Sequence, residues 1–87
     1  MKFTTVTTDV YSTICGEAYR LFIDNELLTE RTFIWDPNLE YVKEHIIVQA
    51  EQGSIHTVSV QSVNNLPCFS LKNVTVDGVK TERTFRV

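Results

Sequence analysis

The Asp77-Gly78 pair near the end of the chain constrains the fold more than any other feature of the sequence. It stands between two runs rich in β-branched residues, and an Asp-Gly pair supplies the positive φ values that a two-residue type I′ hairpin requires. A loop of two residues fixes the register of both strands, so that Val76 faces Val79 and, further from the turn, Lys72 faces Arg83. The second pair joins two like charges, which repel each other across a ladder.

The strand before this turn predicts a β-bulge. Its apolar positions change face between Phe69 and Leu71 on one side and Val74 and Val76 on the other. One extra residue in a strand restores a single inward face. We therefore predict a bulge near Lys72-Asn73, which would also separate the two like charges.

The rest of the chain has the composition and alternation of strands. Thr, Val, Ile and aromatic residues are plentiful and Ala is sparse, which favours pleated strands because β-branched side chains are stiff. The clearest alternation places His56, Val58 and Val60 on an inner face. A helix over 39–51 is the alternative for one segment, where the consecutive β-branched residues 46–48 favour a strand. The expected strands cover residues 3–8, 19–23, 27–35, 41–49 and 56–61, and the expected turns residues 24–26, 36–38 and 51–54.

The spacing of these strands indicates the fold class. About seven short strands with turns between them are typical of a sandwich or a small barrel. A chain of 87 residues is long enough for one hydrophobic core and too short for two. We predict a single all-β domain over residues 1–87, a small antiparallel β-sandwich that is jelly-roll-like.

One pentapeptide occurs twice in the sequence. Thr-Glu-Arg-Thr-Phe occupies residues 29–33 and again residues 81–85, each time shortly after a turn that begins with Asp. One interpretation is a duplicated half-domain whose charged residues project to matched outer positions and contact a neighbour. The alternative is that a Thr-rich strand pattern produced the same five residues by chance and that the charges form a solvated face. The four charged residues are Glu30, Arg31, Glu82 and Arg83.

The sequence contains no recognisable catalytic or metal-binding set. Cys15 and Cys68 lie in uncharged surroundings and not near His45 or His56 in sequence, whereas a cysteine nucleophile needs a base beside it. Single cysteines and histidines form none of the closely spaced pairs that zinc sites use. We expect both cysteines to be reduced thiols that fill apolar space, and we expect no enzyme, no cofactor and no metal. Catalysis would need a cleft that brings a histidine together with a carboxylate or a cysteine.

Acidic residues offer two further alternatives. A pair of glutamates could hydrolyse a glycoside if the fold held them about 5–9 Å apart, but glutamates occur on every soluble surface. Oxygen-rich turns at one end of a sandwich can converge on calcium, although such turns are usually only turns. The calcium set would be Asp24, Asn25, Asp36 and Asn38.

Charge and hydropathy exclude two kinds of partner. The net charge is −3 and the eight basic residues are spread along the chain, so the sequence lacks the concentrated positive charge that nucleic-acid binding needs. No segment has the apolar length of a signal peptide or of a membrane span. We expect the protein in a cytoplasm, or in a particle assembled there, with no nucleic-acid and no membrane partner.

Aromatic residues are the main candidates for an interface. We expect Phe22, Phe33 and Phe69 in the core. Trp35 and Tyr41 suit core packing and exposed contacts equally, because exposed aromatic rings anchor both protein interfaces and sugars. With the charged residues of the repeat, the candidate interface residues are Trp35, Tyr41, Glu30, Arg31, Glu82 and Arg83.

Three segments carry a resemblance to a known group of proteins: residues 19–35, the strand residues 44–46, and the hairpin residues 71–78. With these segments the chain resembles small β-sandwich virion proteins of tailed bacteriophages, notably of cyanophages. The resemblance implies a capsid decoration protein, or a neck or tail subunit, that has no catalytic residues and binds other virion proteins in several symmetric copies. It implies a location in the virion, which assembles in the host cytoplasm.

The hairpin pattern is also similar to carbohydrate-binding modules with jelly-roll folds. In this alternative, Trp35 or Tyr41 would stack on a sugar ring. Such modules usually carry a secretion signal, and its absence from this sequence counts against them.

Overall fold

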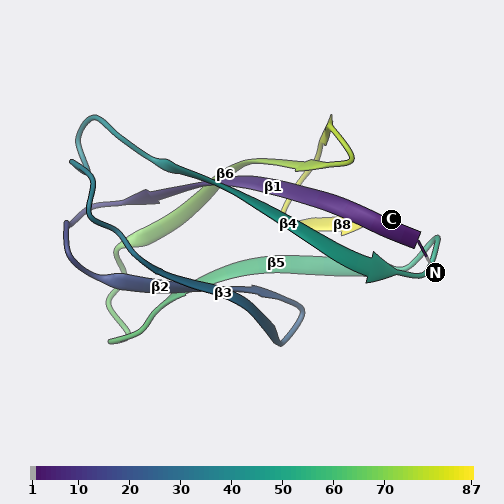
Figure 1. Ribbon diagram of the computed structural model, residues 1–87, viewed down its shortest axis with the longest axis horizontal. Coiled ribbons are helices and arrows are strands. Elements are labelled where there is room, and N and C mark those ends of the chain that lie inside the picture. The colour runs from purple at the N-terminus through teal and green to yellow at the C-terminus, as the bar shows by residue number, and fades with distance from the viewer. Residues whose placement is uncertain (1) are drawn as a thin grey trace.

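The computed structural model of the protein describes residues 2–87, which form two antiparallel four-stranded sheets packed face to face (Figure 1). The all-β sandwich expected from the sequence is confirmed. The first sheet has the order β4-β1-β6-β7, with β1 Lys2–Ser12, β4 Val42–Ala50, β6 Phe69–Val76 and β7 Val79–Lys80. The second has the order β3-β2-β5-β8, with β2 Ala18–Ile23, β3 Glu26–Thr32, β5 Ile55–Ser62 and β8 Thr84–Arg86.

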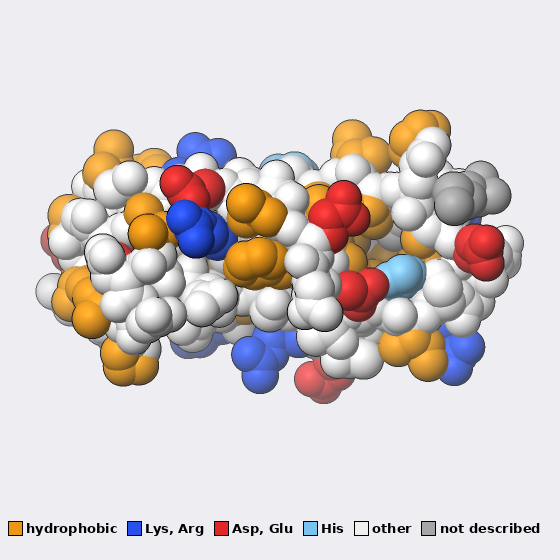
Figure 2. Space-filling model, turned by 90° about the horizontal axis from the view of Figure 1, so that it is seen from below, with side chains coloured by type: hydrophobic (Ala, Val, Ile, Leu, Met, Phe, Trp, Pro, Cys, Tyr) orange, Lys and Arg blue, Asp and Glu red, His pale blue; other side chains and the backbone are white. Residues whose placement is uncertain are grey.

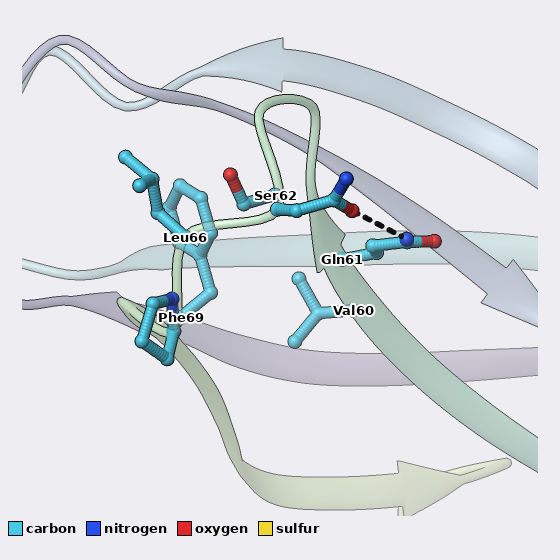
Figure 3. Close-up of a pocket in the computed structure, with 7 residues that line it drawn as sticks. Val60, Gln61, Ser62, Leu66 and Phe69 are labelled. Atoms are coloured by element: carbon cyan, nitrogen blue, oxygen red, sulfur yellow. Dashed lines mark hydrogen bonds between the residues drawn. The ribbon is translucent and has the colours of Figure 1, made fainter.

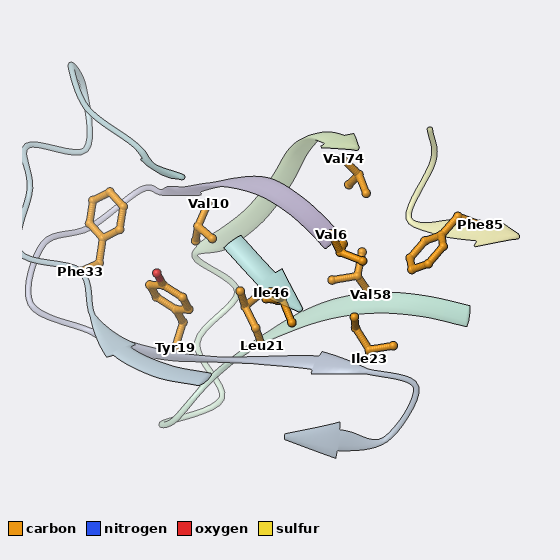
Figure 4. Packing of buried hydrophobic residues seen from close by; sticks show 10 residues of the cluster. All are labelled: Val6, Val10, Tyr19, Leu21, Ile23, Phe33, Ile46, Val58, Val74 and Phe85. Atoms are coloured by element: carbon orange, nitrogen blue, oxygen red, sulfur yellow. The ribbon is translucent and has the colours of Figure 1, made fainter. Parts of the chain in front are cut away.

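The core lies between the sheets and follows the two-residue period of the strands. In β2, Tyr19, Leu21 and Ile23 point inward and are buried, while the residues between them face outward. Full burial of a large apolar side chain stabilises the fold by about 1.5–3 kcal/mol, so this alternation fixes which face of each strand is inside. Figure 4 shows the buried cluster: Val6, Val10, Tyr19, Leu21, Ile23, Phe33, Ile46, Val58, Val74 and Phe85.

The C-terminal hairpin confirms the register expected from the Asp-Gly turn. Asp77 and Gly78 have φ values of 49° and 83°, as a type I′ turn requires, and Val76 pairs with Val79. Asp77 also ties the turn to β1, because its backbone N–H donates to the carbonyl of Thr5 at 2.8 Å and its carboxylate accepts from the Thr5 N–H at 2.9 Å.

The predicted bulge is present. Thr7 of β1 pairs with Thr75 and Asp9 pairs with Lys72, so two residues of β6 oppose one residue of β1. One of the two, Asn73, has a positive φ of 54°. The extra residue restores the inward face of β6, as the change of apolar positions indicated.

The expected pairing of Lys72 with Arg83 is wrong. The second strand of the hairpin ends at Lys80, and the chain then crosses to the other sheet, where β8 pairs with β5. The expected seventh strand is therefore divided into β7 and β8. A two-residue turn determines pairing near the turn, but a crossover between sheets depends on contacts that are distant in sequence.

Two other strands differ in length from the prediction. β1 runs to Ser12 and not to residue 8, because Asp9 and Val10 still pair with β4, and the strand pairs with β6 as far as Ser12. Asp9 and Ser12 are buried although they are polar. β3 ends at Thr32 and not at residue 35, although the Phe33 N–H still donates to the carbonyl of Glu17 at 2.9 Å. The segment 42–50 is a strand, so the helical alternative is wrong.

Candidate functional site

The free edge of β4 differs from the other sheet edges among residues 2–87. β4 pairs with β1 through nine consecutive residue pairs, from Val10 with Val42 to Lys2 with Ala50, without a bulge. In contrast, β7 has two residues, β8 has three, and the β2–β3 ladder has an irregularity next to Leu21. Proteins protect sheet edges with short strands and bulges. The β4 edge has neither protection.

The backbone of β1 shows which β4 amides reach this edge. The carbonyl of Thr5 accepts from the Asp77 N–H and the Thr5 N–H donates to the Asp77 carboxylate, so both backbone groups of Thr5 point to the β6 side. Its pair with Ile47 of β4 is therefore a non-hydrogen-bonded pair. Bonding alternates along an antiparallel strand. The residues whose N–H and C=O groups point to the free edge are therefore Lys43, His45, Ile47 and Gln49.

Exposed apolar side chains flank this edge. Ile47 is 69% exposed and Phe3, which lies beside it on the outer face of β1, is 70% exposed. A groove of about 390 Å³ lies where β4 passes the start of β3. Its lining consists of Phe3, Glu26, Leu28, Ile47, Val48 and Gln49. The edge is therefore a long row of backbone hydrogen-bonding groups beside apolar surface. We did not predict it from the sequence, where the apolar Phe3 and Ile47 were the available signal.

Tyr41, a predicted interface residue, lies at the other end of the same sheet. Its ring stacks on Tyr11 with centroids 5.0 Å apart, and the Lys72 ammonium lies 4.7 Å from the Tyr11 ring centroid. Lys43 contacts Asp9 at 3.0 Å, and this hydrogen bond raises the pKa of Lys43. Tyr41 remains exposed, so the outer face of the first sheet carries an aromatic platform bordered by two lysines.

The other aromatic residues divide between the core and the outer face. Trp35 packs edge-on against Phe33 and is half-buried beside the core. Phe33 is fully buried, and Phe69 packs against the core cluster, as expected. The expectation for Phe22 is wrong, because Phe22 lies between two inward residues of β2 and therefore on the outer face.

Arg31, another predicted interface residue, points between the sheets. Its Nε lies 2.9 Å from a carboxylate oxygen of Glu44, and the Tyr19 hydroxyl donates to that oxygen at 2.5 Å. Glu44 and Tyr19 are buried. The hydrogen bond to Glu44 raises the pKa of Arg31, and burial raises the pKa of Tyr19. One carboxylate of the first sheet thus holds two side chains of the second.

The two copies of the pentapeptide lie at the two edges of the second sheet, at matched positions. Phe33 of the first copy pairs with Glu17, which lies four residues before Leu21. Phe85 of the second copy pairs with His56, which lies four residues before Val60. Because Leu21 and Val60 face each other, a local two-fold axis relates the two pairs. Both phenylalanines are buried.

The charged residues of the two copies have different surroundings. Glu30 accepts a hydrogen bond from Arg20 at 2.6 Å on the outer face, whereas Arg31 is bound to Glu44. Glu82 and Arg83 are exposed in the connection between β7 and β8. The two copies of the pentapeptide therefore have equivalent backbone positions in the sheet, but their charged side chains make different contacts.

His56 is the centre of a polar chain that sequence reasoning missed. Its Nδ1 lies 2.8 Å from the Asp24 carboxylate and its Nε2 lies 2.7 Å from the Ser54 hydroxyl. The expected inner position of His56 is present, and one of its two hydrogen-bond partners comes from a turn 32 residues away. Asp24 also accepts from the Thr57 N–H at 3.0 Å. The hydrogen bond to His56 lowers the pKa of Asp24.

The order Ser-His-Asp is that of a hydrolase triad, but the hydrogen bonds differ from those of a nucleophile site. The Ser54 hydroxyl donates to the carbonyl of Glu51 at 2.5 Å, so its proton is not directed to the imidazole as activation requires. The N–H of Ser54 donates to Glu51 and that of Gly53 to Val87, so neither is available to an oxyanion. The chain of bonds ties the β2–β3 turn to the β4–β5 turn.

A second polar cluster closes the opposite end of the sandwich. Glu17 is buried and accepts hydrogen bonds from the Ser62 hydroxyl and from the backbone and side-chain amides of Asn64. These bonds, the Ser62 bond first, lower the pKa of Glu17. Beside it lies a shallow hollow of about 270 Å³ at the end of β5, where Gln61 donates to Asn65 (Figure 3).

The residues of the alternative calcium set do not converge. Asp24 lies in the turn before β3 and Asp36 in the connection after it, so the two turns lie at opposite ends of that strand. Asp36 instead accepts from the backbone of Asn38 at 2.9 Å. Within residues 2–87, no group of three His, Cys, Asp or Glu side chains is placed to hold a metal ion.

The two cysteines have different surroundings. Both cysteines are free thiols; Cys68 is buried as expected, but Cys15 is exposed, so the expectation that it fills apolar space is wrong.

Seen from below, the molecule shows acidic, basic and hydrophobic side chains interspersed over its surface (Figure 2).

Comparison with family models, with curated proteins and with solved structures finds no match to this chain. Residues 2–87 contain no helix with the length and apolar character that crossing a membrane requires.

Proposed function

We propose that this chain is a structural subunit of a bacteriophage virion, a capsid decoration protein that binds other virion proteins through its sheet edges and outer faces. The observation that carries the proposal is the β4 edge, where a nine-residue strand without a bulge lies beside the exposed Phe3 and Ile47. An unprotected edge of this kind pairs with other chains. The resemblance to small virion proteins of tailed phages supplies the kind of particle.

The stacked pair Tyr11 and Tyr41 supports a second contact on the same sheet. Tyr41 is 47% exposed, and its position over Tyr11 fixes its ring without burying it. Preorganised aromatic rings are frequent anchors of protein interfaces. The proposal assigns the outer face of the first sheet, and not a cleft, to partner binding.

Purified phage particles that carry this chain test the proposal. We expect mass spectrometry to find the chain in a fixed ratio to the major capsid protein, and cryo-electron microscopy to place it at symmetric sites on the capsid exterior. A Tyr41→Ala variant should occupy fewer sites than a Tyr41→Phe variant, which keeps the ring stack. Recovery of the wild-type chain only in the soluble fraction would contradict the proposal.

A carbohydrate-binding module is the second candidate, favoured by the same tyrosine pair. The free face of Tyr41 is open and Lys72 lies nearby over Tyr11, and sugar rings stack on exposed aromatic faces. Binding on a glycan array that is lost in Tyr41→Ala and kept in Tyr41→Phe would favour this candidate. Trp35 is less suited, because it is half-buried against Phe33.

A further inference from the structure

We infer that two copies of this chain pair antiparallel along their β4 edges, so that the two first sheets join into one continuous sheet. This inference rests on the proposed function and names one partner for the β4 edge, a second copy of the chain. The β4 edge offers backbone N–H and C=O groups at every second residue from Lys43 to Gln49, and an identical edge offers the same groups in the opposite direction.

The side chains of β4 select one register. An antiparallel pair centred on Ile47 places the two Ile47 residues opposite each other as a hydrogen-bonded pair, since both direct their backbone to the free edge. His45 of one copy then faces Gln49 of the other. Each of these pairs exchanges two main-chain hydrogen bonds. The exposed Phe3 of each copy lies beside the central isoleucines, so the apolar flank of one copy continues into that of the other.

The same register is complementary in charge. Lys43 lies four residues before Ile47, and Glu51, the residue after the end of β4, lies four residues after it. Lys43, which also contacts Asp9 of its own copy at 3.0 Å, is therefore opposite Glu51 of the second copy at both ends of the contact. On the inner face, Glu44 faces the small Ala50 and Ile46 faces Val48. No like charges are opposed. An acidic end, a basic end and an apolar centre make this segment complementary to itself.

Sedimentation equilibrium of the full chain tests the pairing. We expect a monomer–dimer equilibrium whose dissociation constant rises at least about tenfold in Ile47→Lys, because two lysines would then meet at the two-fold axis. Ile34→Lys is the matched control, since Ile34 is also 69% exposed but lies in the β3–β4 connection; it should leave the constant unchanged. Far-UV circular dichroism verifies that both variants are folded.

A disulfide reports the register directly. Hydrogen-bonded pairs have Cα atoms about 5.5 Å apart, within the range of about 4.4–6.8 Å that a disulfide spans. In a Cys15→Ser background, which removes the exposed native thiol, Ile47→Cys should give a cross-linked dimer on mild oxidation. Ile34→Cys in the same background should not.

Three outcomes overturn the inference: a wild-type chain that stays monomeric at its highest soluble concentration, a dimer that Ile47→Lys leaves intact, or equal cross-linking at positions 47 and 34. A monomer that still binds phage particles would contradict only the pairing. A dimer that binds no particle would contradict the proposed function and leave the pairing supported.

Discussion

The two edges of the first sheet differ in how well they are protected against pairing with another strand. At one edge, β7 has two residues, the preceding strand is bulged, and Asp77 binds the backbone of Thr5 through its side chain. At the other edge, β4 has nine residues in an unbroken ladder, with Ile47 exposed beside it. The difference shows that the sheet is closed to further strands on one side and open on the other.

Proline substitutions at two neighbouring β4 positions break this comparison most strongly. Val48 directs its N–H to β1, so Val48→Pro removes a ladder bond and should lower the free energy of unfolding by about 3 kcal/mol. Gln49 directs its N–H to the free edge, so Gln49→Pro should cost about 1 kcal/mol or less, since proline is tolerated at edges. Urea unfolding at a protein concentration at which the chain is monomeric measures both. Equal losses would show that the inferred direction of the β4 amides is wrong.

The inner face of β4 gives the next largest effect. Glu44→Ala leaves the buried Tyr19 hydroxyl and the Arg31 guanidinium without their acceptor, and should lower the free energy of unfolding by about 2–3 kcal/mol. Glu44→Gln keeps one oxygen acceptor and should lose less. Chemical denaturation compares the two variants; an Ala variant as stable as the wild type would show that the carboxylate does not hold β4 in place.

The protected edge depends on its turn. Gly78 has a φ of 83° with open space around it, so Gly78→Ala adds backbone strain and no clash, at about 1 kcal/mol. Val79→Ala is the control, because Val79 is 69% exposed and such surface changes usually stay within about 0.5 kcal/mol. Thermal unfolding separates the two. If both variants melt together, the turn does not limit the stability of this edge.

Acid should affect the ends of the sandwich through Asp24 and Glu17. Both carboxyls have a pKa in the folded state below their ordinary values of 3.8 and 4.5. The unfolded chain therefore binds protons first, so the stabilisation is complete above about pH 4.5 and is lost as the pH falls through the folded pKa values. In a pH series of urea midpoints, Asp24→Asn should flatten part of this decline. An unchanged slope would exclude Asp24 as a contributor.

Local signals in the sequence predicted what local geometry controls. The Asp-Gly pair gave the turn and its first residue pair, and the change of apolar face gave the bulge at Asn73. The exit of the chain after Lys80 could not be predicted in the same way, because it depends on packing against β5, which is distant in sequence. The same reason explains β1, whose polar residues beyond Thr8 form a strand only because β4 and β6 are present on both sides.

The site was less predictable than the fold. Tyr41 was identified as a candidate, but its stacking partner Tyr11 follows from the β1–β4 register. Arg31 was expected to face a neighbour, yet its partner Glu44 lies on the other sheet, and residue type does not reveal a pairing across two sheets. Sequence alternation indicated that Ile47 and Ile46 lie on opposite faces of a strand, without indicating that this strand is an edge.

The carboxylate of Glu44 has a consequence for how the two layers can move. Apolar contacts are non-directional, so by themselves they select the alignment of two layers less strictly than hydrogen bonds do. Two donors from one layer that converge on a single anion of the other allow only one alignment, since any shear leaves a charge in a dry interior. The two sheets should therefore not slide past each other until the hydrogen bonds to Glu44 break, and they should then separate in one cooperative step.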